Sequence, residues 1–230
     1  MYFQHAPDIW RDYPELTCGT LFASGITNEA RVEESVSRYA AVAQARLAKQ
    51  SEGQFPEIQA WRRTFARMGL KPTQYRCAAE SLLRRFKREG ELPRLHPLVD
   101  LCNAVSMAYA TPIAVFDVDR ITDFLEVRYA SGAEEYLTFA GDTEHPDAGE
   151  VIFADGASRA HARRWTNRQS GHSAVTDATR DVLIVAEAMH EKAGDDMPKL
   201  VATLADEISQ IWAAKVRQGS VTSSAPRFEL

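Results

Sequence analysis

A change of pattern at Pro112 constrains the fold of this chain most. Before it, apolar residues recur at helical spacing; after it, short apolar runs alternate with turns rich in Gly, Asp, Ser and Pro. Clustered helices followed by clustered strands favour an α+β protein with a mixed or antiparallel sheet packed with helices, rather than a regular βαβ alternation. Helices are predicted at 28–49, 56–68, 75–88, 98–109 and 198–216, and strands at 16–24, 113–117, 124–129, 135–139, 151–154 and 181–186.

These elements predict one domain over residues 1–219, followed by a flexible tail at 220–230. We expect residues 112–187 to form the sheet. The helices at 57–68, 76–88 and 97–109 should pack against it.

Composition excludes several classes of protein. Hydrophobic residues make up 45% of the chain and charged residues 26%, the usual mixture for a soluble globular protein. No apolar run approaches the roughly 20 residues of a membrane span, and the first residues lack the pattern of a secretory signal. Three cysteines without CxxC spacing favour free thiols in the cytoplasm. The six histidines show no metal-ligand spacing, so we expect no metal and no cofactor.

Positive charge is concentrated in one part of an acidic chain. Residues 61–94 hold ten Lys or Arg and only three Asp or Glu, although the whole chain has a net charge of −5. The helix within this stretch cannot bury all of its cations, so several must reach solvent or an anionic partner such as tRNA. The alternative is a solvated helical face with no partner. The tRNA-binding candidates here are Arg84, Arg85, Lys87 and Arg88.

The stretch 163–172, sequence RRWTNRQSGH, is the richest in recognition chemistry. Its flat Trp and Arg surfaces can stack on a base, and its amides can both donate and accept hydrogen bonds. The alternative is a rigid turn bonded to its own backbone. The pocket candidates are Trp165, Asn167, Arg168, Gln169 and His172, and Arg164 is a further candidate for tRNA contact.

Two other segments supply pocket candidates. Asn103 and Ser106 lie near each other at i, i+3 on one predicted helix. Asp117 stands where a predicted strand ends, so its carboxylate either faces a pocket or caps a turn.

The order of motifs along the chain resembles free-standing proteins built on the B3/4 domain, the tRNA-editing module of the phenylalanyl-tRNA synthetase beta subunit. The similarity covers residues 55–190. It is carried by Ala60-Trp61-Arg62, Lys71-Pro72-Thr73-Gln74-Tyr75-Arg76, Leu98-Val99-Asp100-Leu101-Cys102-Asn103, Phe116-Asp117-Val118-Asp119-Arg120-Ile121, Gly149-Glu150-Val151-Ile152-Phe153-Ala154-Asp155 and the stretch from Arg164-Trp165 to Thr179.

The resemblance implies an α+β fold and a pocket that, in the synthetase, hydrolyses a wrongly attached tyrosine from tRNA. Two synthetase residues are not matched. Ala114 stands where the synthetase has a His, and Gln169-Ser170-Gly171 stands where its loop has a Glu. Any hydrolysis here would therefore be assisted by the substrate, with a ribose hydroxyl orienting water.

Three functions follow as alternatives. The first is an aminoacyl-tRNA deacylase acting in trans, with tRNA or aminoacyl-tRNA as its partner. The second is a module that binds tRNA or an amino acid without catalysis, and the third is an enzyme for small molecules on the same fold. For the first, we expect Trp165, Arg168 and Gln169 to face the same pocket as Asn103 and Ser106.

Overall fold

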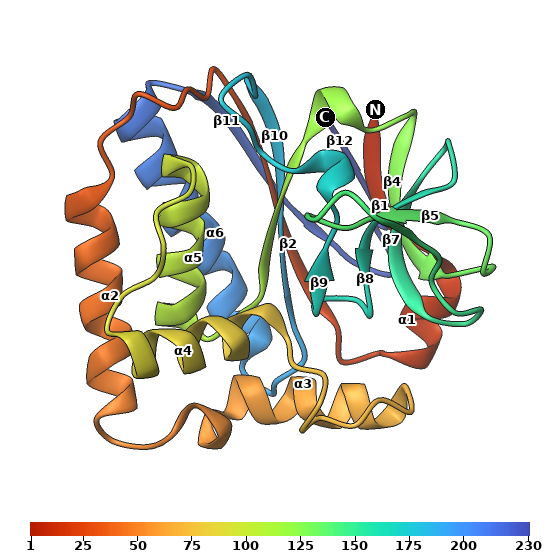
Figure 1. The fold of residues 1–230 in the computed structure, drawn as a ribbon, viewed down its shortest axis with the longest axis horizontal. Helices are drawn as coiled ribbons and strands as arrows, with labels where there is room; N and C mark the ends of the chain where they lie inside the picture. Colours follow the sequence, from red (N-terminus) through yellow and green to blue (C-terminus); the bar gives the residue numbers. More distant parts are fainter.

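The computed structural model describes residues 1–230 and contains two sheets that lie face to face (Figure 1). The larger sheet is mixed and has eight strands; the smaller has four antiparallel strands. The larger runs β12 (Arg227–Glu229), β1 (Tyr2–His5), β4 (Phe124–Tyr129), β7 (Val151–Asp155), β8 (Arg159–Arg163), β5 (Glu135–Leu137) and β6 (Thr143–Glu144), with β9 (Arg168–Gln169) also beside β8. The smaller runs β11 (Lys215–Val221), β2 (Thr17–Ser24), β10 (Asp181–Ala188) and β3 (Ile113–Asp117).

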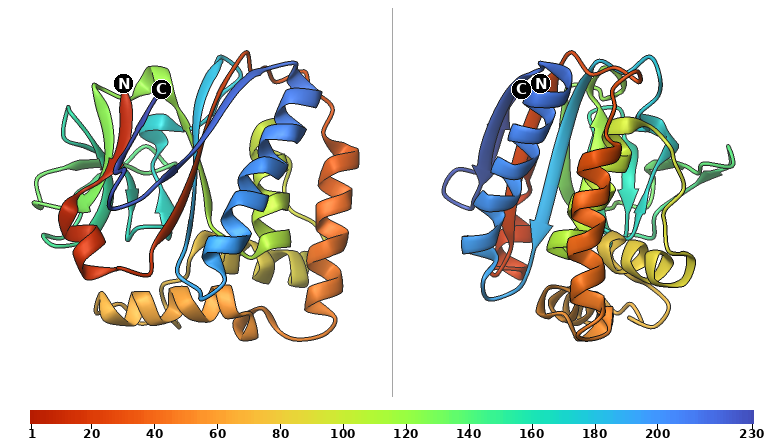
Figure 2. Two further views of the ribbon diagram at one scale, coloured as in Figure 1. Left: turned by 180° about the vertical axis from the view of Figure 1, so that it is seen from behind. Right: turned by 90° about the vertical axis from the view of Figure 1, so that its left-hand side faces the viewer.

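Helices form the third layer of the molecule. Two of them, α5 (Pro97–Tyr109) and α6 (Ala193–Trp212), cover the outer face of the smaller sheet, and α2 (Glu33–Leu47) packs on the far side of α5 (Figure 1). The others are α1 (Pro7–Asp12), α3 (Pro56–Arg67) and α4 (Ala78–Glu89). Seen from behind, α3 runs along one end of the molecule beneath the sheets (Figure 2). None of these helices is long and apolar enough to span a bilayer.

Strand β10 separates the two hydrophobic cores. Its side chains alternate in direction, as in any strand, so Val182 and Ile184 join the core beneath the helices, whereas Leu183 and Val185 join the core between the sheets. Glu187 is the next residue in the second row, which places a carboxylate at the end of an apolar surface.

Close packing of α6 depends on a glycine in β2. A Cβ at Gly19 would overlap Val201 Cγ2 and would lie 2.8 Å from Met197 Sδ. Any larger residue there would push α6 away from the sheet.

The structure confirms the α+β class and the three predicted helices at 57–68, 76–88 and 97–109 to within about two residues. The prediction that residues 112–187 form a single sheet was wrong. There are two sheets, and four of their strands, β1, β2, β11 and β12, come from outside that range.

The C-terminal prediction also needs correction. The helix expected to reach residue 216 ends at Trp212, where Ala213 adopts a left-handed conformation, and the next residues form β11. Part of the expected tail at 220–230 is β12, which pairs with β1 and places Phe228 against the inter-sheet core. Pairing between residues so far apart has no local sequence signal.

We predict that Phe3→Ala lowers the free energy of unfolding by about 3–5 kcal/mol, because Phe3 is fully buried and stacks on Phe153. Urea denaturation measures this change. Leu95→Ala is the control, since Leu95 is 68% exposed and should change stability by no more than about 0.5 kcal/mol. Equal effects for the two variants would contradict the assignment of β1 to the core.

Candidate functional site

The polar loop between β8 and β9 turns through two left-handed residues. Arg164 and Trp165 have φ values of 47° and 57°, a conformation that costs a non-glycine residue roughly 1–2 kcal/mol. Burial of Trp165 offsets this cost. Its ring is fully buried and packs edge-on against Trp61 at 5.3 Å and Tyr13 at 4.8 Å between ring centroids. The turn therefore anchors Trp165 in the core and carries the residues that follow it to the rim of a cleft.

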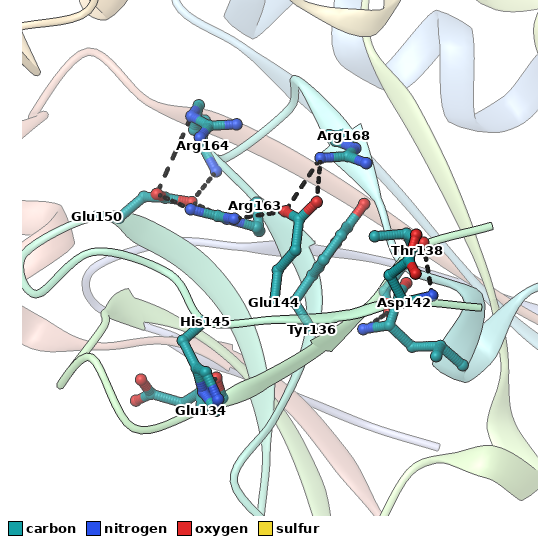
Figure 3. A network of polar contacts seen from close by, with 12 residues as sticks. Glu134, Tyr136, Thr138, Asp142, Glu144, His145, Glu150, Arg163, Arg164 and Arg168 are labelled. Carbon is teal, nitrogen blue, oxygen red and sulfur yellow. Dashed lines mark hydrogen bonds and ion pairs between the residues drawn. The ribbon is translucent and has the colours of Figure 1, made fainter. Parts of the chain in front are cut away.

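A network of ion pairs fixes this loop against the larger sheet (Figure 3). Arg163 is buried and donates two hydrogen bonds of 3.0 Å to Glu150 and one of 2.7 Å to Glu144. Arg168 donates to the same Glu144 at 3.1 and 3.2 Å. The hydrogen bond with Glu150 raises the pKa of Arg163. These pairs hold both ends of the loop, so Arg168 has a protein partner already.

Gln169 is held at both its backbone and its side chain. Tyr136 Oη donates to the Gln169 carbonyl oxygen at 2.7 Å, and Gln169 Nε2 donates to the Val115 carbonyl oxygen at 2.6 Å. The side-chain Oε1 is then the free acceptor of this residue. Gln169 and Ile113 line both of two neighbouring cavities, one beside the loop and β3 and the other between β3 and α5, and we refer to the pair as the cleft.

The inner chamber, the smaller of these cavities, has a volume of about 50 Å³ and mostly apolar walls. Glu187 lines it and is 2% exposed. Its Oε1 accepts from His5 Nε2 at 2.7 Å and from Trp165 Nε1 at 2.9 Å, whereas no protein group donates to its Oε2. The sequence prediction missed Glu187 because the expected strand stopped at Ala186. The available signal was an acidic residue at the position where the alternating pattern of the strand calls for an apolar one.

The outer chamber, the larger cavity, has a volume of about 380 Å³ and combines polar groups with exposed apolar ones. Phe139 and Leu95 line it and are 73% and 68% exposed. An exposed aromatic ring beside a cavity is typical of a surface on which a base stacks. Asn103 and His96 also line this chamber, and burial lowers the pKa of His96, which favours its neutral form.

The structure divides the predicted pocket residues among different places. Trp165, Asn167 and Arg168 line the inner chamber, Asn103 lines the outer one, and Gln169 belongs to both. The expected single pocket is therefore not found: Trp165, Arg168 and Gln169 share the inner chamber, Asn103 and Gln169 share the outer one, and Ser106 lines neither.

Two predicted pocket residues, Ser106 and Asp117, have structural partners instead, and a third, His172, lies outside both chambers. Ser106 is buried and donates to the Thr111 carbonyl oxygen at 2.6 Å. Asp117 accepts from the Asp119 amide and from Thr179 Oγ1 at 2.7 Å, which makes it a turn cap. His172 lines neither chamber, and burial lowers its pKa. Short polar side chains at element ends satisfy nearby backbone groups first.

The predicted tRNA-binding cations are exposed on α4, but each has an acidic neighbour. Arg84 and Lys87 share Glu52, and Arg85 and Arg88 share Glu89. Four cations against two carboxylates leave this helix face positive. Arg164 differs, because its guanidinium lies over the Tyr75 ring at 4.8 Å and its side chain is 17% exposed.

We predict losses of stability of different size for the two arginines at the ends of the loop, Arg163 and Arg168. Arg163→Ala leaves Glu150 buried without its partner and should cost about 3–5 kcal/mol of unfolding free energy. Arg168→Ala removes a pair that is 44% and 36% exposed and should cost about 1 kcal/mol or less. Chemical denaturation of both variants measures the difference, and an Arg163→Ala variant as stable as wild type would show that the network does not hold the loop.

Comparison with known proteins relates this chain to a family. The family model of the B3/4 domain matches residues 60–199. The phenylalanine–tRNA ligase beta subunit of Coxiella burnetii is 38% identical over 60 residues, which cover 26% of this chain and 7% of that protein. The corresponding subunit of Shewanella oneidensis is 25% identical over 116 residues, covering 50% of this chain and 14% of that protein.

Among solved structures, an N-terminal fragment of the phenylalanyl-tRNA synthetase beta subunit from Pyrococcus horikoshii superposes with a TM-score of 0.48 and 9% identity, over 94% of this chain and 49% of that chain. This chain thus corresponds to a small part of each curated relative. Because the family model spans more than half of the sequence, the protein belongs to the B3/4 domain family.

Proposed function

We propose that this protein hydrolyses the ester bond of a mischarged aminoacyl-tRNA, acting in trans. The observation that carries the proposal is the cleft of two unequal, adjoining chambers. The outer chamber, at about 380 Å³, is within the size range of small-molecule sites and has the exposed Phe139 ring at its rim, which suits the terminal nucleoside of tRNA. The inner chamber suits the aminoacyl group.

Two further observations support this assignment. The curated relatives are phenylalanine–tRNA ligase beta subunits. In addition, Ala114 lines the inner chamber, and it stands at the position that the resemblance matches to a His of the synthetase's editing pocket. A ligand in this chamber would thus occupy the counterpart of that pocket.

The chemistry proposed is attack by water on the ester carbonyl carbon. The bond from that carbon to the ribose oxygen breaks, the ribose oxygen takes up a proton, and the products are a free amino acid and tRNA with a free terminal hydroxyl. Orientation of the reactants supplies much of the rate enhancement in such a site. Gln169 Oε1, at the junction of the chambers, would accept a hydrogen bond from the water or from the adjacent ribose hydroxyl.

A binding module without catalysis is the second candidate. No His, Cys or Ser lines the inner chamber, so the site lacks the usual nucleophiles and bases other than Glu187. This candidate predicts retention of aminoacyl-tRNA in the cleft without release of the amino acid.

We predict that the purified protein deacylates at least one member of a panel of mischarged tRNAs. Gln169→Ala should lower kcat/KM about 10–100-fold, because one hydrogen-bonding partner in a closed site is worth about 1–3 kcal/mol. Gln59→Ala, an exposed glutamine on α3, is the control and should have no effect. Binding of aminoacyl-tRNA without deacylation of any member would favour the binding module.

We also predict that tRNA affinity falls steeply as salt concentration rises. Replacing the four α4 cations by Ala should reduce the slope of log K against log salt by roughly 1–3, since each lost phosphate contact releases about one fewer counterion. A control variant neutralises exposed lysines elsewhere, namely Lys49, Lys192, Lys199 and Lys215. An unchanged slope in the α4 variant would remove this helix from the tRNA interface.

A further inference from the structure

We infer that Glu187 makes the inner chamber selective for a short aminoacyl side chain that bears a hydroxyl group, threonine fitting best and serine next. The inference rests on the proposed function and specifies its substrate class. It depends on the hydrogen bonds of Glu187, on the size of the chamber and on the composition of its walls.

The carboxylate of Glu187 is only half satisfied by the protein. Both neighbouring side-chain donors, His5 Nε2 and Trp165 Nε1, bond to Oε1. Oε2 has no protein donor, although only 2% of the residue is exposed to solvent. Oε2 is not one of the fully buried polar atoms that lack a partner, so it still reaches solvent, and a ligand O–H group that replaces water there forms a charge-assisted hydrogen bond. A purely apolar ligand would desolvate this oxygen further and gain nothing there.

The size of the inner chamber limits the ligand to a short side chain. Its volume is about 50 Å³, against about 380 Å³ for the outer chamber. The smaller chamber therefore favours a short side chain over a phenol ring. The remaining walls include Ala114, Phe153 and Val185, which suit a methyl group. A branched side chain with one hydroxyl and one methyl matches both surfaces.

Glu187 is also held in a fixed position. Its carbonyl oxygen accepts from Trp61 Nε1 at 3.3 Å, in addition to the two donors on Oε1. His5 belongs to β1, which lies outside the family match at residues 60–199. The N-terminal strand thus contributes a positioning residue to this chamber.

Threonine and valine provide the sharpest test because they have the same shape and differ by the hydroxyl group. One tRNA, charged in turn with threonine, serine, valine or alanine, is mixed with excess enzyme and the single-turnover hydrolysis rate is measured. We expect wild type to hydrolyse the threonyl ester at least about 100-fold faster than the valyl ester, since sites built to bond a hydroxyl strongly reject isosteres that lack it. In Glu187→Gln and Glu187→Ala, the ratio of threonyl to valyl hydrolysis should fall to about 10 or less.

Glu134→Gln is the matched control. Glu134 is equally buried and bonded to the protein, but it lines neither chamber. This variant should keep the wild-type ratio of threonyl to valyl hydrolysis.

The possible outcomes separate this inference from the proposed function. Equal wild-type rates for threonyl and valyl esters overturn the inference and leave deacylation standing. An equal loss of rate for all four esters in the Glu187 variants also overturns it, because the carboxylate would then bind the α-ammonium group or act in the chemistry. Absence of hydrolysis of any ester overturns the proposed function and the inference with it. If the Glu187 variants do not fold, the wild-type ratio alone decides.

Discussion

The structure depends on Glu187, a buried residue that three aromatic donors hold in place, two at its carboxylate and one at its backbone carbonyl oxygen. His5 from β1, Trp165 from the β8–β9 loop and Trp61 from α3 all bond to Glu187 near the end of β10. A carboxylate inside a protein must be compensated by donors, so these contacts tie the larger sheet, the smaller sheet and a helix to one residue. The same residue lines the inner chamber, which makes the geometry of the candidate site a consequence of how the layers are joined.

Much of the fold could be predicted because its helices and central strands carry periodic apolar patterns. The strands β1 and β12 could not, since they are short and exist only through pairing between opposite ends of the chain. For the site, the 163–172 stretch was identified, but its composition could not separate residues that anchor the loop from residues that face the cleft. Glu187 could not be predicted as a site residue, because its role comes from tertiary contacts with His5 and Trp165.

The polar loop therefore acts mainly as a scaffold. Trp165 fills the core, Arg163 pairs with two buried or half-buried carboxylates, and Gln169 reaches the boundary between the chambers. The division into a small chamber with a carboxylate and a larger one with an exposed phenylalanine supports a ligand of two chemically different parts. An aminoacyl group joined to a nucleoside is such a ligand, and its ester bond would lie at the junction beside Gln169.

The most direct test of this account is a crystal structure with threonyl-3′-amino-3′-deoxyadenosine, whose amide link resists hydrolysis. The account predicts the adenine ring against Phe139 in the outer chamber and the threonine hydroxyl at hydrogen-bonding distance, about 2.5–3.0 Å, from Glu187 Oε2. The amide carbon would then lie beside Gln169. Binding in another cavity, or with the threonine side chain in the outer chamber, would contradict it.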